Sequence, residues 1–216
     1  MGADFQKMRS DMVEQQIQRR GVRDPATLQA MRDVPRHLFV PEIMRPYSYE
    51  DGPLSIGHGQ TISQPYIVAL MTEAAKLKPG DIVLEIGTGS GYAAAVLAKI
   101  VKEVYTVERL APLAARAEKE FKEQGYPNIH VKVGDGTLGW KEHGPYDAII
   151  VTAGAPVIPE SFIDQLKLNG RVIIPVGDEL GQQLLRLTKT LGSTYQREML
   201  EYVRFVPLIG EQGWQP

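Results

Sequence analysis

The feature that most constrains this chain is a glycine-rich turn between an apolar run and a helix-forming run. The apolar run spans Val83 to Ile86, the helix-forming run spans Tyr92 to Ile100, and the turn contains Gly87, Gly89 and Gly91. Glycine permits positive φ and lets a ligand approach the backbone where a Cβ would block it. The segment therefore predicts a strand, a tight turn and a helix, with a nucleotide-like ligand against the turn.

The spacing of these glycines narrows the choice of ligand. A dinucleotide fingerprint places its third glycine at position 92, where this chain has Tyr92. A phosphate-binding loop would have a lysine after the glycines, and none is present. The turn instead has an acidic residue, Glu85, at its entrance and no fixed positive charge. These features favour a cationic, phosphate-free nucleoside such as S-adenosylmethionine, although the bare pattern would also suit a turn that binds nothing.

Composition excludes several classes of protein and site. The chain has 216 residues, of which 43% are hydrophobic, and this fits one globular domain. Its 24 basic and 26 acidic side chains give a net charge of -2, so bulk electrostatics favours neither nucleic acid nor an anionic membrane. The absence of cysteine excludes disulfides, thiolate metal sites and cysteine nucleophiles. With no signal-peptide pattern and no membrane-length apolar run, we expect a cytoplasmic protein.

Hydrophobic periodicity and turn residues predict the order of the elements. In the N-terminal part we expect a helix over Ala3 to Arg20, a second from Asp24 to about Val34, an irregular stretch over 35–64 and a helix over Pro65 to Lys76. Strands are then expected at Ile82 to Ile86, Glu103 to Val107, Ile129 to Val133, Ala148 to Thr152 and Arg171 to Val176. The helices between them are expected at Tyr92 to Ile100, Ala111 to Gln124 and Pro159 to Leu166.

This alternation predicts an α/β fold with a doubly wound, mostly parallel, Rossmann-like sheet and helices on both faces. Gln182 to Thr190 and Tyr195 to Pro207 predict a C-terminal antiparallel strand pair. We expect a single domain over 1–216, with N-terminal helices and a substrate and cofactor loop in 1–64 and the core in 65–216. Ligands of such sheets bind at the carboxyl ends of the strands.

Two acidic residues follow the second and third predicted strands. Glu108 lies about twenty residues after the glycine turn, where a carboxylate can accept hydrogen bonds from a ribose diol. Asp135, inside the run Gly134 to Thr137, is placed to accept from an adenine amino group. Two simpler roles stay open, since Glu108 could favour a helix start through the helix dipole and Asp135 could serve only its turn.

With these motifs in place, the chain resembles the protein-L-isoaspartate (D-aspartate) O-methyltransferase family over nearly its whole length. The glycine turn and Glu108 are common to methyltransferases, whereas Thr61 to Pro65 and Ile174 to Gly177 are specific to this family. The other matching segments are Pro35 to Pro41, Gly59 to Gln60, Leu84 to Tyr92, Val107 to Arg109, Gly134 to Gly136 and Tyr146 to Thr152.

The resemblance implies a protein-repair enzyme. Its reaction moves a methyl group from S-adenosylmethionine to the α-carboxylate of L-isoaspartyl, and by the family's name D-aspartyl, residues in damaged proteins and peptides. S-adenosyl-L-homocysteine is the other product, and the ester closes to a succinimide that hydrolyses partly to normal aspartate. A carboxylate with a pKa near 4 is already ionised at neutral pH, so no general base is needed. The enzyme's task is to position the two reactants out of water.

The resemblance also implies roles for particular residues. The expected catalytic residue is Ser63, whose hydroxyl would orient the substrate carboxylate, although its position alone would equally suit a cap of the helix opening at Pro65. The expected cofactor-binding residues are Thr61, Ile62, Ser63, Glu85, Gly87, Thr88, Gly89, Gly91, Glu108, Arg109, Asp135 and Gly136. The expected substrate-binding residues are His58, Thr61, Val206, Pro207 and Leu208.

Simpler readings and rival functions remain at this point. A lone loop histidine is more often structural, an apolar stripe is more often core, and His37, His130 and His143 show no metal-ligand spacing, so no metal is expected. The main rival is a methyltransferase of the same fold acting on RNA or a small molecule, and a non-catalytic adenosine-binding module is another. No basic cluster with interleaved aromatics supports RNA. We expect isoaspartyl proteins and peptides as partners, no nucleic acid or membrane, and a monomer.

Overall fold

The structure is a computed structural model that describes residues 4–178, 180–191 and 194–215. Its first helical stretch is α1 (Phe5–Asp11), continued by a π-helical segment (Met12–Ile17) and a 3-10 segment (Gln18–Arg20), and Gly21 ends it with a φ of 104°. The second is α2 (Pro25–Asp33). The Asp24 side chain accepts a hydrogen bond from the Thr27 amide, as an N-cap does. Both predicted N-terminal helices are confirmed.

The stretch over 35–64 is more ordered than the sequence suggested. It contains two 3-10 helices (Arg36–Phe39 and Glu42–Tyr47) and a hairpin of β1 (Leu54–Gly57) and β2 (Gln60–Ile62). His58 and Gly59 form the hairpin loop with φ values of 55° and 70°. A two-residue hairpin loop of type I′ needs positive φ at both positions, and Gly59 adopts it without steric cost. The expectation of an irregular segment was wrong at this hairpin, because its glycines shape a turn between strands.

A seven-stranded sheet forms the centre of the rest of the chain. Its strands are β3 (Ile82–Ile86), β4 (Glu103–Glu108), β5 (Ile129–Val133), β6 (Tyr146–Val151), β7 (Leu166–Gly177), β8 (Gln182–Lys189) and β9 (Tyr195–Val203). The spatial order is β5-β4-β3-β6-β7-β8-β9. The first five of these are parallel, and β8 runs antiparallel to both β7 and β9. The strand β7 begins five residues before the predicted start at Arg171, and the other strands agree with the predictions to within a few residues.

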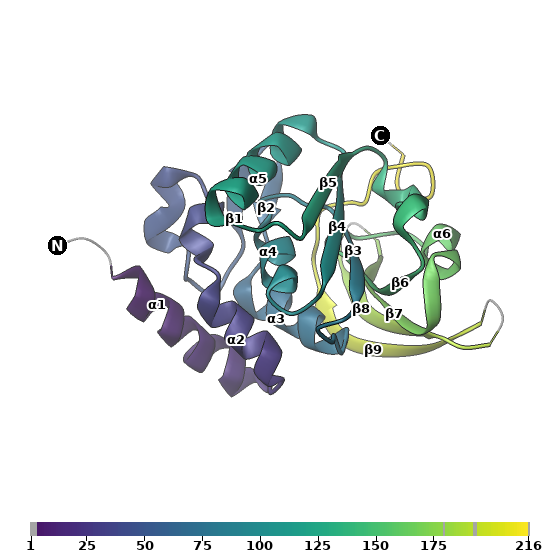
Figure 1. The fold of residues 1–216 in the computed structure, drawn as a ribbon, viewed down its shortest axis with the longest axis horizontal. Helices are drawn as coiled ribbons and strands as arrows, with labels where there is room; N and C mark the ends of the chain where they lie inside the picture. The colour runs from purple at the N-terminus through teal and green to yellow at the C-terminus, as the bar shows by residue number, and fades with distance from the viewer. Residues whose placement is uncertain (1–3, 179, 192–193, 216) are drawn as a thin grey trace.

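Helices cover both faces of this sheet, as expected. The helices α3 (Pro65–Ala74), α4 (Tyr92–Ala98) and α5 (Ala111–Gln124) lie with the N-terminal helices on one side, and α6 (Glu160–Asp164) lies on the other (Figure 1). The apolar stripe of α5, Leu113, Ala117 and Phe121, recurs at helical spacing and is buried. Among the described residues, no helix is long and apolar enough to cross a membrane.

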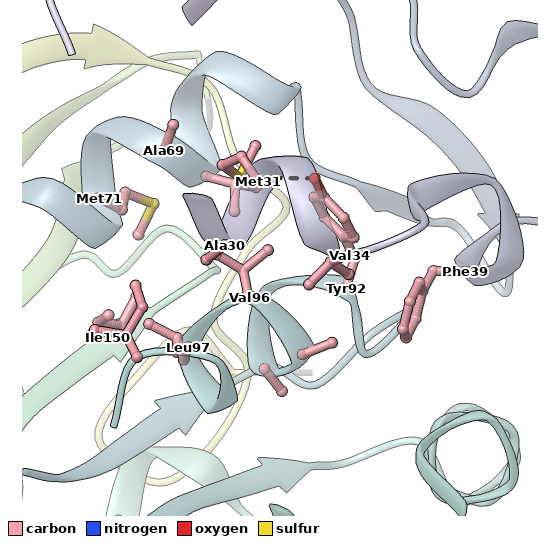
Figure 2. Packing of buried hydrophobic residues seen from close by; sticks show 14 of the residues in the cluster. Ala30, Met31, Val34, Phe39, Ala69, Met71, Tyr92, Val96, Leu97 and Ile150 are labelled. Carbon is pink, nitrogen blue, oxygen red and sulfur yellow. Dashed lines mark hydrogen bonds between the residues drawn. The ribbon is translucent and has the colours of Figure 1, made fainter. Parts of the chain in front are cut away.

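The N-terminal helices extend the hydrophobic core. Figure 2 shows Met31 of α2 and Val34, the residue after α2, packed against Tyr92 and Val96 of α4, and the Tyr92 hydroxyl contacts the Met31 sulfur at 3.6 Å. All four side chains are essentially inaccessible to solvent. This packing holds the segment after α2 close to the start of α4, beside the glycine turn.

Candidate active site

A cavity opens at the carboxyl ends of β3, β4 and β6. The strand β3 lies between β4 and β6, so the chain connections at these strand ends run to opposite sides of β3. This is the position at which open α/β sheets bind their ligands. Segments far apart in the sequence complete it, since β2 and the residues after it form one wall and the C-terminal segment forms another. The predicted site residues that line it are Thr61, Ile62, Ser63, Gly87, Thr88, Gly89, Glu108, Arg109, Gly136, Val206, Pro207 and Leu208.

Glu108 is held rigidly at the tip of β4. One carboxylate oxygen accepts the Gly89 amide at 2.8 Å, and the other accepts the Leu110 amide at 3.0 Å. Leu110 is the residue before α5, so Glu108 also supports a helix start, and the two roles weighed from the sequence are compatible. A carboxylate offers about four acceptor positions, so Glu108 keeps the capacity to accept bonds from a ligand.

Glu85 precedes the turn, but its side chain is not accessible to a ligand there, which corrects the sequence-based expectation. It is fully buried beneath the turn and does not line the cavity. The Thr106 hydroxyl donates to its carboxyl at 2.6 Å, and the Thr106 and Thr88 hydroxyls are 2.7 Å apart. Burial raises the pKa of Glu85 to about 8, because its effect is larger than that of the Thr106 hydrogen bond, which lowers the pKa. The hydrogen bonds of Glu85 thus reach the cavity through Thr106 and Thr88, and Thr88 lines it.

Gly91 also lies outside the cavity lining, for a reason of packing. It caps the start of α4 with a φ of 87°, and a Cβ there would meet the Phe121 ring of α5 at 2.7 Å. Glycine is thus required for the approach of two helices, whereas Gly87 and Gly89 present their backbone to the cavity. The spacing of the three glycines could not separate these two uses, because all three positions need positive φ and therefore favour the same residue type.

Asp135 and His58 likewise do not line the cavity. The two Asp135 oxygens accept bonds from the amides of Thr137 and Glu211, at 2.8 Å each, and from the Thr137 hydroxyl. Burial would raise the pKa of Asp135, but these hydrogen bonds outweigh it and hold the pKa below its ordinary value. The carboxylate thus fastens the C-terminal segment, and His58 is exposed in the hairpin loop.

Ser63 lies where two hollows meet. It lines the cavity, and it also lines a neighbouring groove between the stretch after β2 and the end of β9. The two hollows share Thr61, Ser63, Thr152 and Val206. The N-cap of α3 is Gln64, which makes no side-chain capping bond, so Ser63 does not occupy the capping position considered from the sequence.

Several residues that line the cavity were not predicted from the sequence. Thr152 follows β6 directly and donates to the carbonyl oxygens of Ile86 and Gly87, at 3.0 and 2.7 Å. The rule that ligands meet strand ends could have found it. The same rule applies to Ile86 and Val107, which end their predicted strands. No local signal distinguishes the others, which are Gln60, Val68, Ser90, Tyr92, Ala93, Ala153 and Ile209.

Known proteins resemble this chain over its full length. The model of the family described as Protein-L-isoaspartate(D-aspartate) O-methyltransferase matches residues 7–213. The chain belongs to this family. A protein-L-isoaspartate O-methyltransferase of Trichlorobacter lovleyi is 55% identical, with 98% of each chain covered. Another, of Pelobacter propionicus, is 56% identical, with 95% of this chain and 92% of the relative covered.

Solved structures agree with this assignment. One protein-L-isoaspartate O-methyltransferase superposes with a TM-score of 0.85 at 32% identity, covering 95% of this chain and 67% of the other. A Plasmodium falciparum protein assigned to the same activity, in complex with S-adenosyl-L-homocysteine, has a TM-score of 0.81 at 29% identity, covering 93% and 98%. The family, the fold class, the methyltransferase activity and the S-adenosylmethionine cofactor expected from the sequence are confirmed.

Proposed function

We propose that this chain methylates the α-carboxylate of L-isoaspartyl residues in damaged proteins and peptides, with the methyl donor in the cavity and the peptide in the adjoining groove. The observation that carries the proposal is the position of Ser63 at the junction of the two hollows. A methyl donor and an acceptor peptide must meet at one point, and the reacting atoms must approach in line. Ser63 stands at that point.

The cavity has the chemistry that S-adenosylmethionine requires. Glu108 keeps free acceptor positions for a ribose diol, and the glycine turn exposes backbone where a side chain would block a ligand. Val107, Leu208 and Ile209 give an apolar wall for a purine ring. Among the described residues that line the cavity, Arg109 has the one basic side chain. A lining with so little positive charge suits a ligand without phosphates.

The positions of these residues suggest their chemical roles in the methyl transfer. When bound, S-adenosylmethionine supplies an electrophilic methyl group on a sulfonium. The Ser63 hydroxyl, which has no hydrogen-bond partner within the described part of the chain, donates to the substrate carboxylate and orients one oxygen toward the methyl donor. Val206 and Pro207 help to exclude water from that point. No side chain is asked to remove a proton, because the nucleophile is already an anion.

For its surroundings we propose a cytoplasmic monomer. The absence of cysteine suits a reducing compartment. The cavity and the groove are both formed by residues of one chain, so the site needs no second copy. Size-exclusion chromatography with light scattering tests the monomer, and an active dimer would contradict it.

The first prediction is a test of substrate choice with two matched peptides. Purified protein with radiolabelled S-adenosylmethionine should methylate an isoaspartyl peptide and leave its aspartyl twin unlabelled, because only the isoaspartyl residue presents a free α-carboxylate within the chain. A peptide in which that carboxylate is amidated serves as the control. Equal labelling of the first two peptides, or no labelling of either, would refute the proposed substrate.

The second prediction separates orientation of the substrate from a purely structural role of Ser63. Ser63→Ala should lower kcat by about 10- to 100-fold, since misplacing a reactant by about 1 Å costs on that scale. Cofactor affinity should stay nearly unchanged, and no new pH dependence should arise near neutrality, because no base is removed. Methylation rates and calorimetric titration with S-adenosyl-L-homocysteine measure these effects. Full activity together with a melting temperature lowered by several degrees would show that the Ser63 hydroxyl supports the fold and does not orient the substrate.

A further inference from the structure

Arg36 is a fully buried arginine that the reaction described above does not use. Its exposed fraction is 0%, and it begins the 3-10 helix Arg36–Phe39 that follows α2. Burial lowers the pKa of Arg36 to about 10, which leaves the guanidinium charged at neutral pH. A buried charge destabilises a fold unless it is well paired, so the presence of Arg36 needs an explanation.

No carboxylate explains it. Within the described residues Arg36 forms no salt bridge, and its Nη1 atom has no hydrogen-bond partner. The guanidinium instead bridges two backbone carbonyls that are distant in the sequence. Its Nε donates to Ser48 at 2.7 Å, and its Nη2 donates to Ser63 at 2.8 Å. The carbonyl of the proposed catalytic serine is thus one of its two acceptors.

The other contacts of Arg36 explain how it holds that serine in place. Ser48 is itself fully buried and donates its hydroxyl to the Arg45 carbonyl at 2.7 Å, so one end of the bridge is fixed. The Arg36 Cζ lies 4.8 Å from the centre of the Tyr92 ring, which orients the plane of the guanidinium. Tyr92 lines the cavity and is itself anchored in the core beside Met31 and Phe39 (Figure 2).

We propose that Arg36 is a positioning residue for the methyl transfer: it ties the backbone of Ser63 to the fixed segment at Ser48 and thereby sets the Ser63 hydroxyl at the junction of cavity and groove. This inference rests on the proposed role of Ser63. The bridge joins backbone atoms, so it constrains the path of the chain where the hydroxyl must point at the substrate.

The geometry of the bridge requires arginine rather than any cation. A guanidinium presents several N–H donors in a rigid plane, so it can reach two carbonyls and lie on an aromatic ring at once. A lysine ammonium has the same charge but is a point donor on a flexible stem. Arg36→Lys therefore keeps the charge and loses the bridge, whereas Arg36→Gln loses the charge and leaves a neutral side chain that costs less to bury.

A double-mutant cycle with Ser63→Ala tests the proposal. Arg36→Lys should lower kcat for the isoaspartyl peptide by about 10- to 100-fold, the scale for a misplaced catalytic group. In the Ser63→Ala background the same replacement should change kcat less than about threefold, because residues that act as one unit are not additive. The affinity for S-adenosyl-L-homocysteine should change less than about threefold in both backgrounds. Arg36→Gln should behave like Arg36→Lys, and it replaces that variant if the lysine protein does not fold.

A matched control is Arg116→Lys. Arg116 also donates to a distant backbone carbonyl, that of Ile56 at 3.0 Å, but it does not touch Ser63, so its replacement should leave kcat unchanged. Near wild-type kcat for folded Arg36→Lys overturns the proposal. An equal loss of kcat in the presence and absence of the Ser63 hydroxyl also overturns it, because Arg36 would then support the fold in general and not Ser63 in particular. Failure of the wild-type protein to methylate the isoaspartyl peptide would instead refute the proposed function, independently of Arg36.

Discussion

Replacing Glu85 with glutamine should remove a large part of the pH dependence of this protein's stability between about pH 4.5 and pH 8. Glu85 is completely buried, and burial raises the pKa of its carboxyl from 4.5 to about 8 in the folded protein. In the unfolded chain the same carboxyl ionises near its ordinary value. Between these two values unfolding therefore releases a proton, and a rise in pH favours the unfolded state.

The sign and size of this effect follow from the two pKa values. The stabilisation that the protonated carboxyl provides is fully present below about pH 4.5 and is lost as the pH rises toward 8. One pKa unit corresponds to about 1.4 kcal/mol, so the total loss is on the order of 5 kcal/mol. Glutamine cannot ionise, so the variant should gain stability over the wild type as the pH rises, even if it is less stable at pH 5.

Urea unfolding at closely spaced pH values measures this difference directly. The wild-type free energy of unfolding should fall more steeply with pH than that of Glu85→Gln. Glu118→Gln, at an exposed position on α5, is the matched control and should follow the wild type. Parallel curves for wild type and Glu85→Gln would show that Glu85 ionises normally in the folded protein, and the account of its burial would then be wrong.

Glu108→Ala should weaken cofactor binding strongly while the protein remains folded. Loss of a charged hydrogen-bond partner costs about 1.5 to 3 kcal/mol, which corresponds to about a 10- to 150-fold weaker Kd. The reason is that Glu108 carries the acceptor oxygens at the tip of β4, fixed by the amides of Gly89 and Leu110. Calorimetric titration with S-adenosyl-L-homocysteine measures the change.

The control for this variant comes from the same strand. Glu103 lies at the opposite end of β4, where its carboxylate bonds to His130 at 2.9 Å, far from the carboxyl edge that binds the ligand. Glu103→Ala should leave the Kd unchanged. A folded Glu108→Ala protein that binds S-adenosyl-L-homocysteine as tightly as the wild type would rule out Glu108 as the ribose-binding residue.

The sequence by itself determined the main helices and strands and their order, although not the hairpin of β1 and β2. Asp24 and Pro25 start a helix through a local capping bond, and the period of Leu113, Ala117 and Phe121 marks the buried side of α5. Such signals act over a few residues, so they can be read without the fold. Glycine spacing and the strand ends also indicated the edge of the sheet at which the cavity lies, together with the lining at Gly87 to Gly89, Glu108 to Arg109 and Gly136.

Only the tertiary structure decided which side chains reach the cavity. The strand β3 is central and covered on both faces, so alternation along it could not show that Glu85 points into the core. Gly91 and Asp135 are used in packing and in fastening the C-terminal segment, and their partners Phe121 and Glu211 lie far along the chain.

The family resemblance pointed to Ser63, Thr61 and Val206, but no local pattern showed that these residues meet where the cavity joins the groove. The walls of this junction come from the stretch after β2 and from the C-terminal segment, which are brought together only when the sheet is complete. The bridge from Arg36 to Ser48 and Ser63 likewise joins three separate segments. Local patterns reflect interactions between near neighbours, whereas a site built by long-range packing depends on distances that no short pattern contains.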